Sequence, residues 1–439
     1  MAKASIQRRT FLKAAAGAAV VPYVVPSSVL GQDGAVPPSE KIVMGAIGVG
    51  PQGTFVMRNF LAQKDCRVVA VCDVKSNVLA EKKALVDRHY GDTGCAAYGD
   101  FRELLARDDI DAVSIATCDH WHVLCAIAAA KAKKDVYLEK PMGLSMAQDQ
   151  ALRTACKRYG TVFQFGTQQR SDRQFLHACE LVRNGKIGEL KTINVWSPGS
   201  SAGGSPEVVP VPEWLNYDFW LGPAPLVPYT KDRCSNSLWW FISDYALGYI
   251  AGWGVHPLDI ALWGGGEKTA CNLEIEGTGV FPTEGVANTA LNWNVKVKFD
   301  SGVRMNFTGC PYPEEWKKRY GRTTDHGTAF EGTEGWVHVD RGGINAHPQS
   351  LLTAELGPND TRLYKSTHHQ RNLLDCIRTR GKTVCPIEDA VAADTLCQLS
   401  DIATRLEKKL RWDWKREQFI DDTEANRMLS RPMRSPWTL

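Results

Sequence analysis

Three glycines near the start of the chain have the spacing expected of a site for a pyrophosphate. Gly48, Gly50 and Gly53 form the pattern G-x-G-x-x-G. The first glycine of this pattern permits a tight turn, the second lets backbone approach the pyrophosphate, and the third lets a helix pack on a strand. The N–H groups at the start of that helix then face the phosphates. The pattern therefore predicts a dinucleotide site, which also takes in Pro51 and Gln52.

The segments on either side of these glycines are those that the pattern requires. An apolar run at residues 42–47 predicts a buried parallel strand that ends directly before the glycines. Apolar residues then recur at helical spacing from Phe55 to Leu61. Strand, turn and helix in this order distinguish a dinucleotide site from a glycine turn that binds nothing.

An acidic residue follows the next predicted strand. The apolar run at residues 66–72 ends in Asp73. A carboxylate at this place can accept hydrogen bonds from the adenosine ribose, which favours NAD. Lys75 could instead meet a 2′-phosphate, so NADP stays open.

Strand-like and helix-like segments continue to alternate as far as residue 165, which predicts a doubly wound parallel sheet. Further strands are expected at 112–116, 136–138 and 162–165, and helices at 76–90, 123–133 and 152–159. Ligands of such sheets bind beyond the carboxyl ends of the strands. The residues that fall at these ends are Gly48, Asp73, Thr117, His122, Glu139 and Lys140.

Three segments together resemble one known family. GVGPQG, ATCDHWH and the LEKP of Leu138–Pro141 are similar to the glucose–fructose oxidoreductase / inositol dehydrogenase / MocA (Gfo/Idh/MocA) family, and the resemblance runs from Lys41 to the C-terminus. It implies an oxidoreductase of CH–OH groups that uses NAD or NADP. It also implies that Thr117 and His122 lie along the cofactor, although Cys118 stands where the family usually has proline. The cofactor contacts expected are Gly48, Gly50, Pro51, Gln52, Gly53, Asp73, Thr117, His120, His122, Glu139, Lys140 and Gln168.

The lysine of the EKP segment is the first candidate catalytic residue. By the resemblance, Lys140 lies beside the nicotinamide and the substrate hydroxyl. A lysine that is partly desolvated near a positive ring should have a lowered pKa. Its amine could then take the proton of an alcohol while hydride leaves the carbon. A surface lysine at a strand end is the competing interpretation.

The second half of the chain has a different pattern. Strands with β-branched residues are expected at 271–277, 291–299, 303–307 and 335–339, with few helices between them. They predict an open, mainly antiparallel sheet in a C-terminal α+β domain. Helices are expected at 372–379 and 387–411. The predicted divisions are a leader (1–31), a Rossmann domain (41–165), a sheet domain (166–370) and C-terminal helices with a tail (371–439).

The remaining candidate catalytic residues are His256 and Asp259, three positions apart at the start of a predicted helix. The family pattern is D-x-G-x-H-x-x-D, so the resemblance implies that His256 is the acid–base residue on the substrate side and Asp259 its neighbour. Gly252 replaces the first aspartate of the pattern. Asp244 or Tyr245, a little upstream, could substitute for it.

Charge and the N-terminal leader bear on partners and location. The net charge is +3, but four lysines and arginines lie within residues 1–31, and without them it is −1. This balance argues against binding of nucleic acid. Arg8 and Arg9 precede a weakly apolar stretch, 14–30, which resembles a twin-arginine export signal and is a poor membrane span. We therefore expect a periplasmic or otherwise exported protein, carried by the twin-arginine machinery, that holds its cofactor tightly.

Other features fit a soluble globular enzyme. The thirteen cysteines are an odd number without C-x-x-C, which predicts buried small residues rather than a zinc site or a disulfide framework. No metal site is predicted. The resemblance implies a homo-oligomer that oxidises or reduces a sugar, sugar acid or polyol. Two rival functions stay open: a glycosidase or epimerase that recycles NAD, and a sugar-binding protein without catalysis.

Overall fold

The computed structural model describes residues 36–439 except residue 236 and residues 322–323. The predicted export signal, 1–31, lies outside these residues. Residues 1–41 and 42–439 separate into two units, and the second is described below. None of the helices in the described part has the length and apolar character needed to cross a membrane.

The first sheet has six parallel strands in the order β3-β2-β1-β4-β5-β6, which confirms the predicted doubly wound sheet. Its strands are β1 (Ile42–Ile47), β2 (Cys66–Cys72), β3 (Ala96–Tyr98), β4 (Ala112–Ile115), β5 (Asp135–Leu138) and β6 (Phe163–Phe165). The strand order changes direction between β1 and β4, so this is the place where the fold opens a crevice for a ligand.

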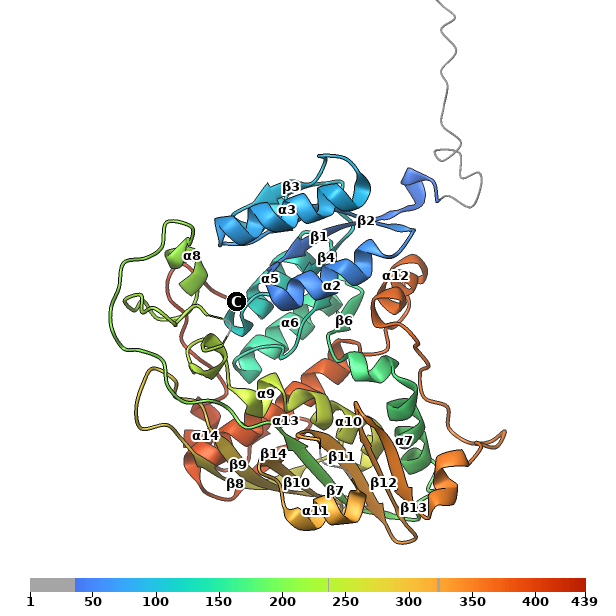
Figure 1. Cartoon of the computed structure of the whole chain (residues 1–439). Coiled ribbons are helices and arrows are strands. Elements are labelled where there is room, and N and C mark those ends of the chain that lie inside the picture. The colour runs from blue at the N-terminus through green and yellow to red at the C-terminus, as the bar shows by residue number, and fades with distance from the viewer. Residues whose placement is uncertain (1–35, 236, 322–323) are drawn as a thin grey trace, which may run out of the picture. The chain divides into compact units, whose positions relative to one another are not determined.

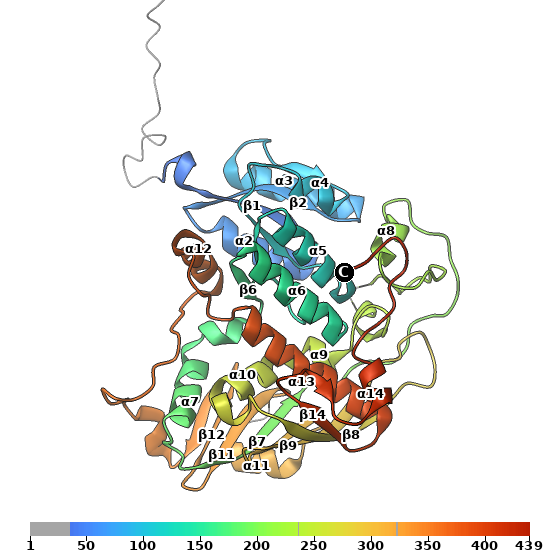
Figure 2. The same ribbon diagram turned by 180° about the vertical axis from the view of Figure 1, so that it is seen from behind.

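Helices cover both faces of the first sheet, as Figures 1 and 2 show. They are α2 (Pro51–Leu61), α3 (Ser76–Tyr90), α4 (Phe101–Leu105), α5 (Asp119–Lys131) and α6 (Met146–Tyr159). Side chains of α2 and α3 share one apolar cluster with β1 and β2, and side chains of α4, α5 and α6 share another with β4 and β5. Phe55 on α2 nevertheless faces solvent, with 56% of its surface exposed.

The second sheet has nine strands and is antiparallel except for the β7–β10 pair, which confirms the predicted open, mainly antiparallel sheet. The strands are β7 (Leu190–Ser197), β8 (Leu273–Val280), β9 (Asn292–Phe299), β10 (Arg304–Gly309), β11 (Gly327–Gly332), β12 (Trp336–Asp340), β13 (Gly343–His347), β14 (Leu410–Asp413) and β15 (Gln418–Phe419). Buried and exposed residues alternate along β9, so one face of the sheet is packed and the other is open.

The packed face carries α7, α10 and α13, of which α10 and α13 lie between the two sheets in both views (Figures 1 and 2), and α11 packs on the other face against Trp196 of β7. The helices of the second half are α7 (Arg173–Arg183), α8 (Tyr217–Leu221), α9 (Tyr249–Gly252), α10 (Val255–Gly265), α11 (Glu314–Tyr320), α12 (His369–Thr379), α13 (Ile387–Leu406) and α14 (Thr423–Arg427). Side chains of α13 join the same apolar cluster as strands β8 and β9.

The C-terminal region differs from its prediction as one long helix over 387–411. Helix α13 stops at Leu406 because Glu407 adopts a left-handed conformation, with φ of 49°. The chain then forms β14, which pairs antiparallel with β8 and extends the sheet. Residues 410–413 and 418–419 thus belong to the second sheet, because their backbones hydrogen-bond to its edge.

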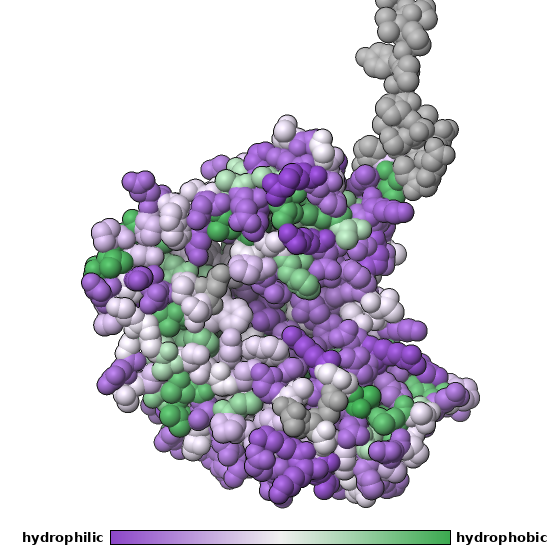
Figure 3. Space-filling view, viewed as in Figure 1, coloured by the Kyte–Doolittle hydropathy of each residue, from purple (hydrophilic) through white to green (hydrophobic). Residues whose placement is uncertain are grey.

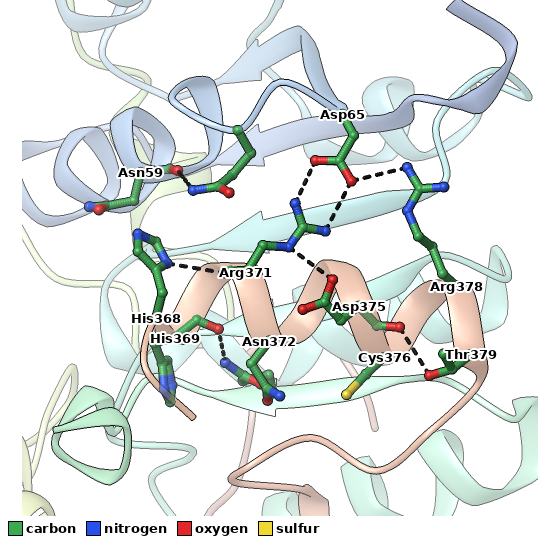
Figure 4. A network of polar contacts seen from close by, with 12 residues as sticks. Asn59, Asp65, His368, His369, Arg371, Asn372, Asp375, Cys376, Arg378 and Thr379 are labelled. Carbon is green, nitrogen blue, oxygen red and sulfur yellow. Dashed lines mark hydrogen bonds and ion pairs between the residues drawn. The ribbon is translucent and has the colours of Figure 1, made fainter. Parts of the chain in front are cut away.

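Helix α12 fastens the C-terminal region to the first sheet, as Figure 4 shows. The guanidinium groups of Arg371 and Arg378 bind the carboxylate of Asp65, which precedes β2, at 2.5 and 3.1 Å. His368 caps the helix by accepting from the N–H of Arg371. His369 is buried and its Nε2 lies 2.7 Å from the carbonyl oxygen of Phe165, so this pair of histidines is structural.

Candidate active site

A cavity of about 370 Å³ opens beyond the carboxyl ends of β1, β2, β4 and β5. The predicted cofactor residues in its lining are Gly48, Gly50, Pro51, Gln52, Asp73, Thr117, His122, Glu139 and Lys140. The structure therefore brings nine of the expected positions to one place. Gly53, His120, Gln168, His256 and Asp259 lie outside the lining.

The three glycines of the turn differ in what surrounds them. Gly48 has φ of +74°, and a Cβ there would lie 2.6 Å from the carbonyl oxygen of Ala116 on the neighbouring strand. At Gly53 a Cβ would lie 1.9 Å from the carbonyl oxygen of Gly48, so this glycine lets α2 pack on β1. Gly50 has no atom within 4 Å of the place of a Cβ, which leaves open space toward the cavity. This is the cradle that a pyrophosphate needs.

Asp73 is fixed at the place where a ribose would lie. Its Oδ2 accepts from the N–H of Val49, and its Oδ1 accepts from the N–H of Lys75, both at 3.0 Å. Desolvation raises the pKa of the carboxyl, which these backbone donors partly offset. The Lys75 ammonium donates to the carbonyl oxygen of Cys234 at 2.9 Å, so it is already engaged at the cavity wall.

A second wall of the cavity comes from residues 214–235 and 237–240, which we call the cover segment. The N–H of Ser76 donates to the carbonyl oxygen of Trp214 at 2.8 Å, which ties the cover segment to the start of α3. It contributes four aromatic residues to the lining: Phe219, Trp220, Trp239 and Trp240. The indole Nε1 of Trp240 is buried and has no hydrogen-bond partner among the described residues, so a bound ligand could accept from it.

Lys140 lies at the end of β5 between the two halves of the chain. Its Nζ donates to the carbonyl oxygen of Gly252 at 2.9 Å and lies 5.2 Å from the ring of Trp240. Desolvation lowers the pKa of this amine, while the charges of Glu139 and Asp119 oppose the shift. The position and the pKa direction both fit the predicted role of proton acceptor.

Glu139 is buried beside Lys140 and is held by neighbours. Its Oε1 accepts from the amide of Gln168 at 2.8 Å and from the hydroxyl of Tyr137 at 3.3 Å. Gln168 therefore lies behind the cavity and positions Glu139. Burial raises the pKa of Glu139 and the charge of Lys140 lowers it.

His256 lies at the start of α10, four residues after the glycine whose carbonyl accepts from Lys140. The ring is buried, and its Nδ1 has no hydrogen-bond partner in the described part of the chain. Burial lowers the pKa of His256 well below its ordinary value, and the charge of Lys140 adds to this effect. The amine of Lys140 thus contacts the segment that leads into α10, and its charge acts on the imidazole of His256 from the other half of the chain.

Asp259 lies on the same helix as His256, but its carboxylate binds Arg170. The guanidinium of Arg170 donates to its two oxygens at 2.8 and 2.6 Å, and the two side chains are only 3% and 0% exposed. The sequence predicts Asp259 as a partner of the histidine in catalysis. The ion pair instead gives it the geometry of a residue that anchors α10.

His120 and His122 also have settled partners. His122 lines the cavity, and its two ring nitrogens lie 2.7 and 3.2 Å from the carbonyl oxygens of Pro141 and Thr117. The Nε2 of His120 lies 2.9 Å from the carbonyl oxygen of Trp220, behind the lining. Burial lowers the pKa of each histidine to about 4.

The replacement of the family aspartate by Gly252 leaves the partner of Lys140 to be identified. Asp244 lines a different cavity, and the hydroxyl of Tyr245 accepts from Arg233 at 3.2 Å. Asp119, the first residue of α5, lies in the cavity wall and its charge acts on Lys140. Burial raises the pKa of Asp119 well above its ordinary value. Its place at the start of α5, four residues after β4 ends, was the available signal, because polar residues beyond strand ends reach the crevice.

The lining fits a dinucleotide. Open space at Gly50 and backbone N–H groups at the start of α2 suit a pyrophosphate, Asp73 suits a ribose, and the Trp240 indole offers an unpaired donor. Among the described residues there is no group of three or more histidine, cysteine or acidic side chains that could hold a metal ion. All thirteen cysteines are free.

The fold and the site define a two-domain protein with a dinucleotide-binding Rossmann half. Residues 42–167 match the family model described as "Oxidoreductase family, NAD-binding Rossmann fold", and residues 199–439 match that described as "Oxidoreductase family, C-terminal alpha/beta domain". The chain belongs to the Gfo/Idh/MocA oxidoreductase family. The predicted resemblance to this family and the predicted NAD-type cofactor are thereby confirmed.

Individual relatives match in part or at low identity. The chain is similar to a myo-inositol 2-dehydrogenase of Thermotoga maritima, with 32% identity over 154 residues that span 35% of this chain and 44% of the relative. It is 35% identical over 113 residues to a glycosyl hydrolase family 109 protein of Shewanella sp. (strain ANA-3), which covers 24% of each chain. Both matches therefore span less than half of the relative's own length.

A solved aldose-aldose oxidoreductase from Caulobacter crescentus has a similar fold. It superposes with a TM-score of 0.60 over 84% of this chain and 99% of that one, at 19% identity. At this identity the likeness concerns the fold.

Proposed function

We propose that this protein is an NAD-dependent oxidoreductase that transfers hydride between the cofactor and a hydroxyl or ketone of a sugar, sugar acid or polyol. The observation that carries the proposal is a hydrogen bond. Lys140, in the lining of the dinucleotide cavity, donates to the carbonyl oxygen of Gly252, four residues before His256. The family match and the named relatives support it, since one is a myo-inositol 2-dehydrogenase and another an aldose-aldose oxidoreductase.

Each residue has a task in this reaction. The bound nicotinamide ring would accept hydride from the carbon that carries the hydroxyl. Lys140, with its lowered pKa, takes the hydroxyl proton, and the buried imidazole of His256 bonds to the substrate through its unpartnered nitrogen. The glycine turn and Asp73 hold the dinucleotide. The cover segment excludes water from the reacting atoms.

The test is NADH formation from NAD over a panel of sugars, sugar acids and polyols. The wild type should reduce NAD with at least one of them, and Lys140→Gln should lose a factor of about 10²–10⁴ in kcat while it still binds NAD. Lys131→Gln, on the exposed end of α5, is the matched control and should match the wild type. Sugar binding that survives Lys140→Gln without any turnover in the wild type would favour a sugar-binding protein.

A second candidate is a glycosidase or epimerase that oxidises a sugar transiently and restores NAD. The observation that favours it is the similarity to a glycosyl hydrolase family 109 protein. Incubation with aryl glycosides decides between the two. Release of the aryl group without net NADH supports the second candidate, and stoichiometric NADH supports the first.

We also propose that residues 1–31 are a twin-arginine signal and that the protein is exported with its cofactor in place. The Arg8-Arg9 pair ahead of an apolar stretch supports export, and the cover segment over the cavity supports slow release of the cofactor. Replacement of both arginines by lysine should retain the protein in the cytoplasm. Mass spectrometry of the denatured, purified protein should find NAD or NADP in an amount nearly equimolar with the protein.

Self-association is proposed for the open face of the nine-stranded sheet. Glu276, Lys296 and Lys298 point outward there, and Figure 3 shows hydrophilic side chains at the lower centre, where Figure 1 places α11. Light scattering should give a mass above that of one chain, and charge reversal at Lys296 and Lys298 should lower it.

A further inference from the structure

An arginine that no sequence pattern singled out lies beside the candidate catalytic groups. Arg341 occupies the two-residue turn between β12 and β13, where Asp340 pairs with Gly343. The Oδ1 of Asp340 accepts from the N–H of Gly342 at 2.7 Å, and the Thr324 hydroxyl donates to the same carboxylate. The buried Asp340 therefore holds the turn rigidly, so the position of Arg341 is set by the fold.

The guanidinium of Arg341 lies over Trp253. Its Cζ is 4.6 Å from the centre of that ring. Trp253 directly follows Gly252, whose carbonyl accepts from Lys140, and its ring lies 5.7 Å from that of His256. Arg341 and His256 thus both lie against the ring of Trp253, and the charge of Arg341 acts on both His256 and Lys140.

The charge of Arg341 is not matched by a direct carboxylate contact. No ion pair joins it to any acidic side chain among the residues that the structure describes. Asp172, Glu139 and Asp325 act on it only through longer-range attraction. Asp325 is itself engaged with His326, whose Nδ1 lies 2.8 Å from its Oδ1. Atoms packed around Arg341 lower the pKa of its guanidinium through desolvation, yet the residue is exposed, so a ligand that enters from solvent can reach it.

Two buried histidine nitrogens around the same indole also lack partners among the described residues. They are the Nδ1 of His256 and the Nε2 of His326, and the two residues are 3% and 8% exposed. The rings of His326 and Trp253 are 4.9 Å apart. Buried polar groups are rarely left unpaired, so these nitrogens point to a polar ligand that completes them.

We propose that Arg341 binds the carboxylate of the substrate, so that the enzyme acts on an acidic sugar such as a uronic acid. The inference rests on the proposed function, since it names the substrate class of the same site. A planar guanidinium matches a carboxylate in a two-point hydrogen bond. A single arginine near Asp172 and Asp325 suits one negative charge better than the two of a phosphate. The sugar hydroxyls would then bond to the unpaired histidine nitrogens.

The experiment compares matched pairs of substrates, glucose with glucuronate and galactose with galacturonate. Binding is followed by tryptophan fluorescence, and turnover by NADH formation, in the wild type and in Arg341→Gln. The wild type should bind an acid at least about tenfold more tightly than its neutral counterpart. Arg341→Gln should lower the acid-to-neutral ratio of affinities and of kcat/KM by about 10- to 100-fold. Arg341→Lys, which keeps the charge without the planar fork, should give an intermediate ratio.

The controls separate this inference from the proposed function. Arg416→Gln removes an exposed arginine from the turn between β14 and β15 and should keep the wild-type ratio. Acid-selective binding that needs Arg341, without NADH formation, would support the inference and overturn the proposed function. Equal affinity for acid and neutral sugars, no binding of any acid, or tighter binding of a hexose 6-phosphate would overturn the inference whether or not NAD is reduced.

Discussion

The glycine turn offers a sharp test because two of its glycines should fail in different ways. At Gly48, an alanine would adopt φ of +74°, and its Cβ would lie 2.6 Å from both Ala116 O and Thr117 N. The left-handed conformation costs about 1–2 kcal/mol and the overlap with backbone about 1–3 kcal/mol more. Gly48→Ala should therefore lower the free energy of unfolding of the apoprotein by about 2–5 kcal/mol.

Gly50→Ala should leave the stability of the fold nearly unchanged and weaken only the binding of the cofactor. Gly50 has φ of −60°, which any residue can adopt, and nothing lies within 4 Å of the added Cβ. Its unfolding free energy should change by less than about 1 kcal/mol. The new methyl group enters the space for the pyrophosphate, so the Kd for NAD should rise by roughly 5- to 150-fold, equivalent to about 1–3 kcal/mol.

Urea unfolding of cofactor-free protein and calorimetric titration with NAD measure the two effects separately. The reasoning is refuted if Gly50→Ala is destabilised as much as Gly48→Ala, or if Gly50→Ala binds NAD as tightly as the wild type does.

Three further outcomes follow from the site. Asp73→Ser removes a carboxylate that would repel a 2′-phosphate, so the ratio of NADP to NAD affinity should rise at least about tenfold; an unchanged ratio would show that the carboxylate does not face the ribose. Because desolvation lowers the pKa of Lys140 below its ordinary 10.5, sugar oxidation should rise with pH and level off above a midpoint below that value; a rate independent of pH would argue against a lysine base. Asp259→Asn should lower the free energy of unfolding in urea, by less than the roughly 3–5 kcal/mol of a wholly unpaired buried charge, since Asp389 still pairs with Arg170; lost kcat at unchanged stability would restore Asp259 to the catalytic set.

Much of the first half could be predicted because its signals are local. An apolar run that ends in glycines specifies β1 and its turn, and a polar residue at a strand end must reach the crevice. The bounds predicted for the strand at 66–72 and the helix at 76–90 are those observed. Lys140 could be predicted as a site residue for the same reason, because it follows the end of β5.

The rest of the site depends on contacts between distant parts of the chain. Trp240 reaches the cavity from the cover segment, and Arg341 arrives on a hairpin about 200 residues beyond Lys140. The sequence around Trp240 or Arg341 contains no pattern that predicts that either side chain lies at the site. The ion pair between Asp259 and Arg170 could not be predicted either. Helical spacing places Asp259 beside His256, but it does not indicate that Arg170, far away in the sequence, binds the carboxylate.

A crystal structure of the protein with NAD bound tests the central claim most directly. The account predicts the pyrophosphate over Gly50 and the nicotinamide ring at the Lys140 end of the cavity, with the amine of Lys140 and the imidazole of His256 both facing the space above the ring. A nicotinamide ring directed away from Lys140, or a dinucleotide bound outside this cavity, would contradict it.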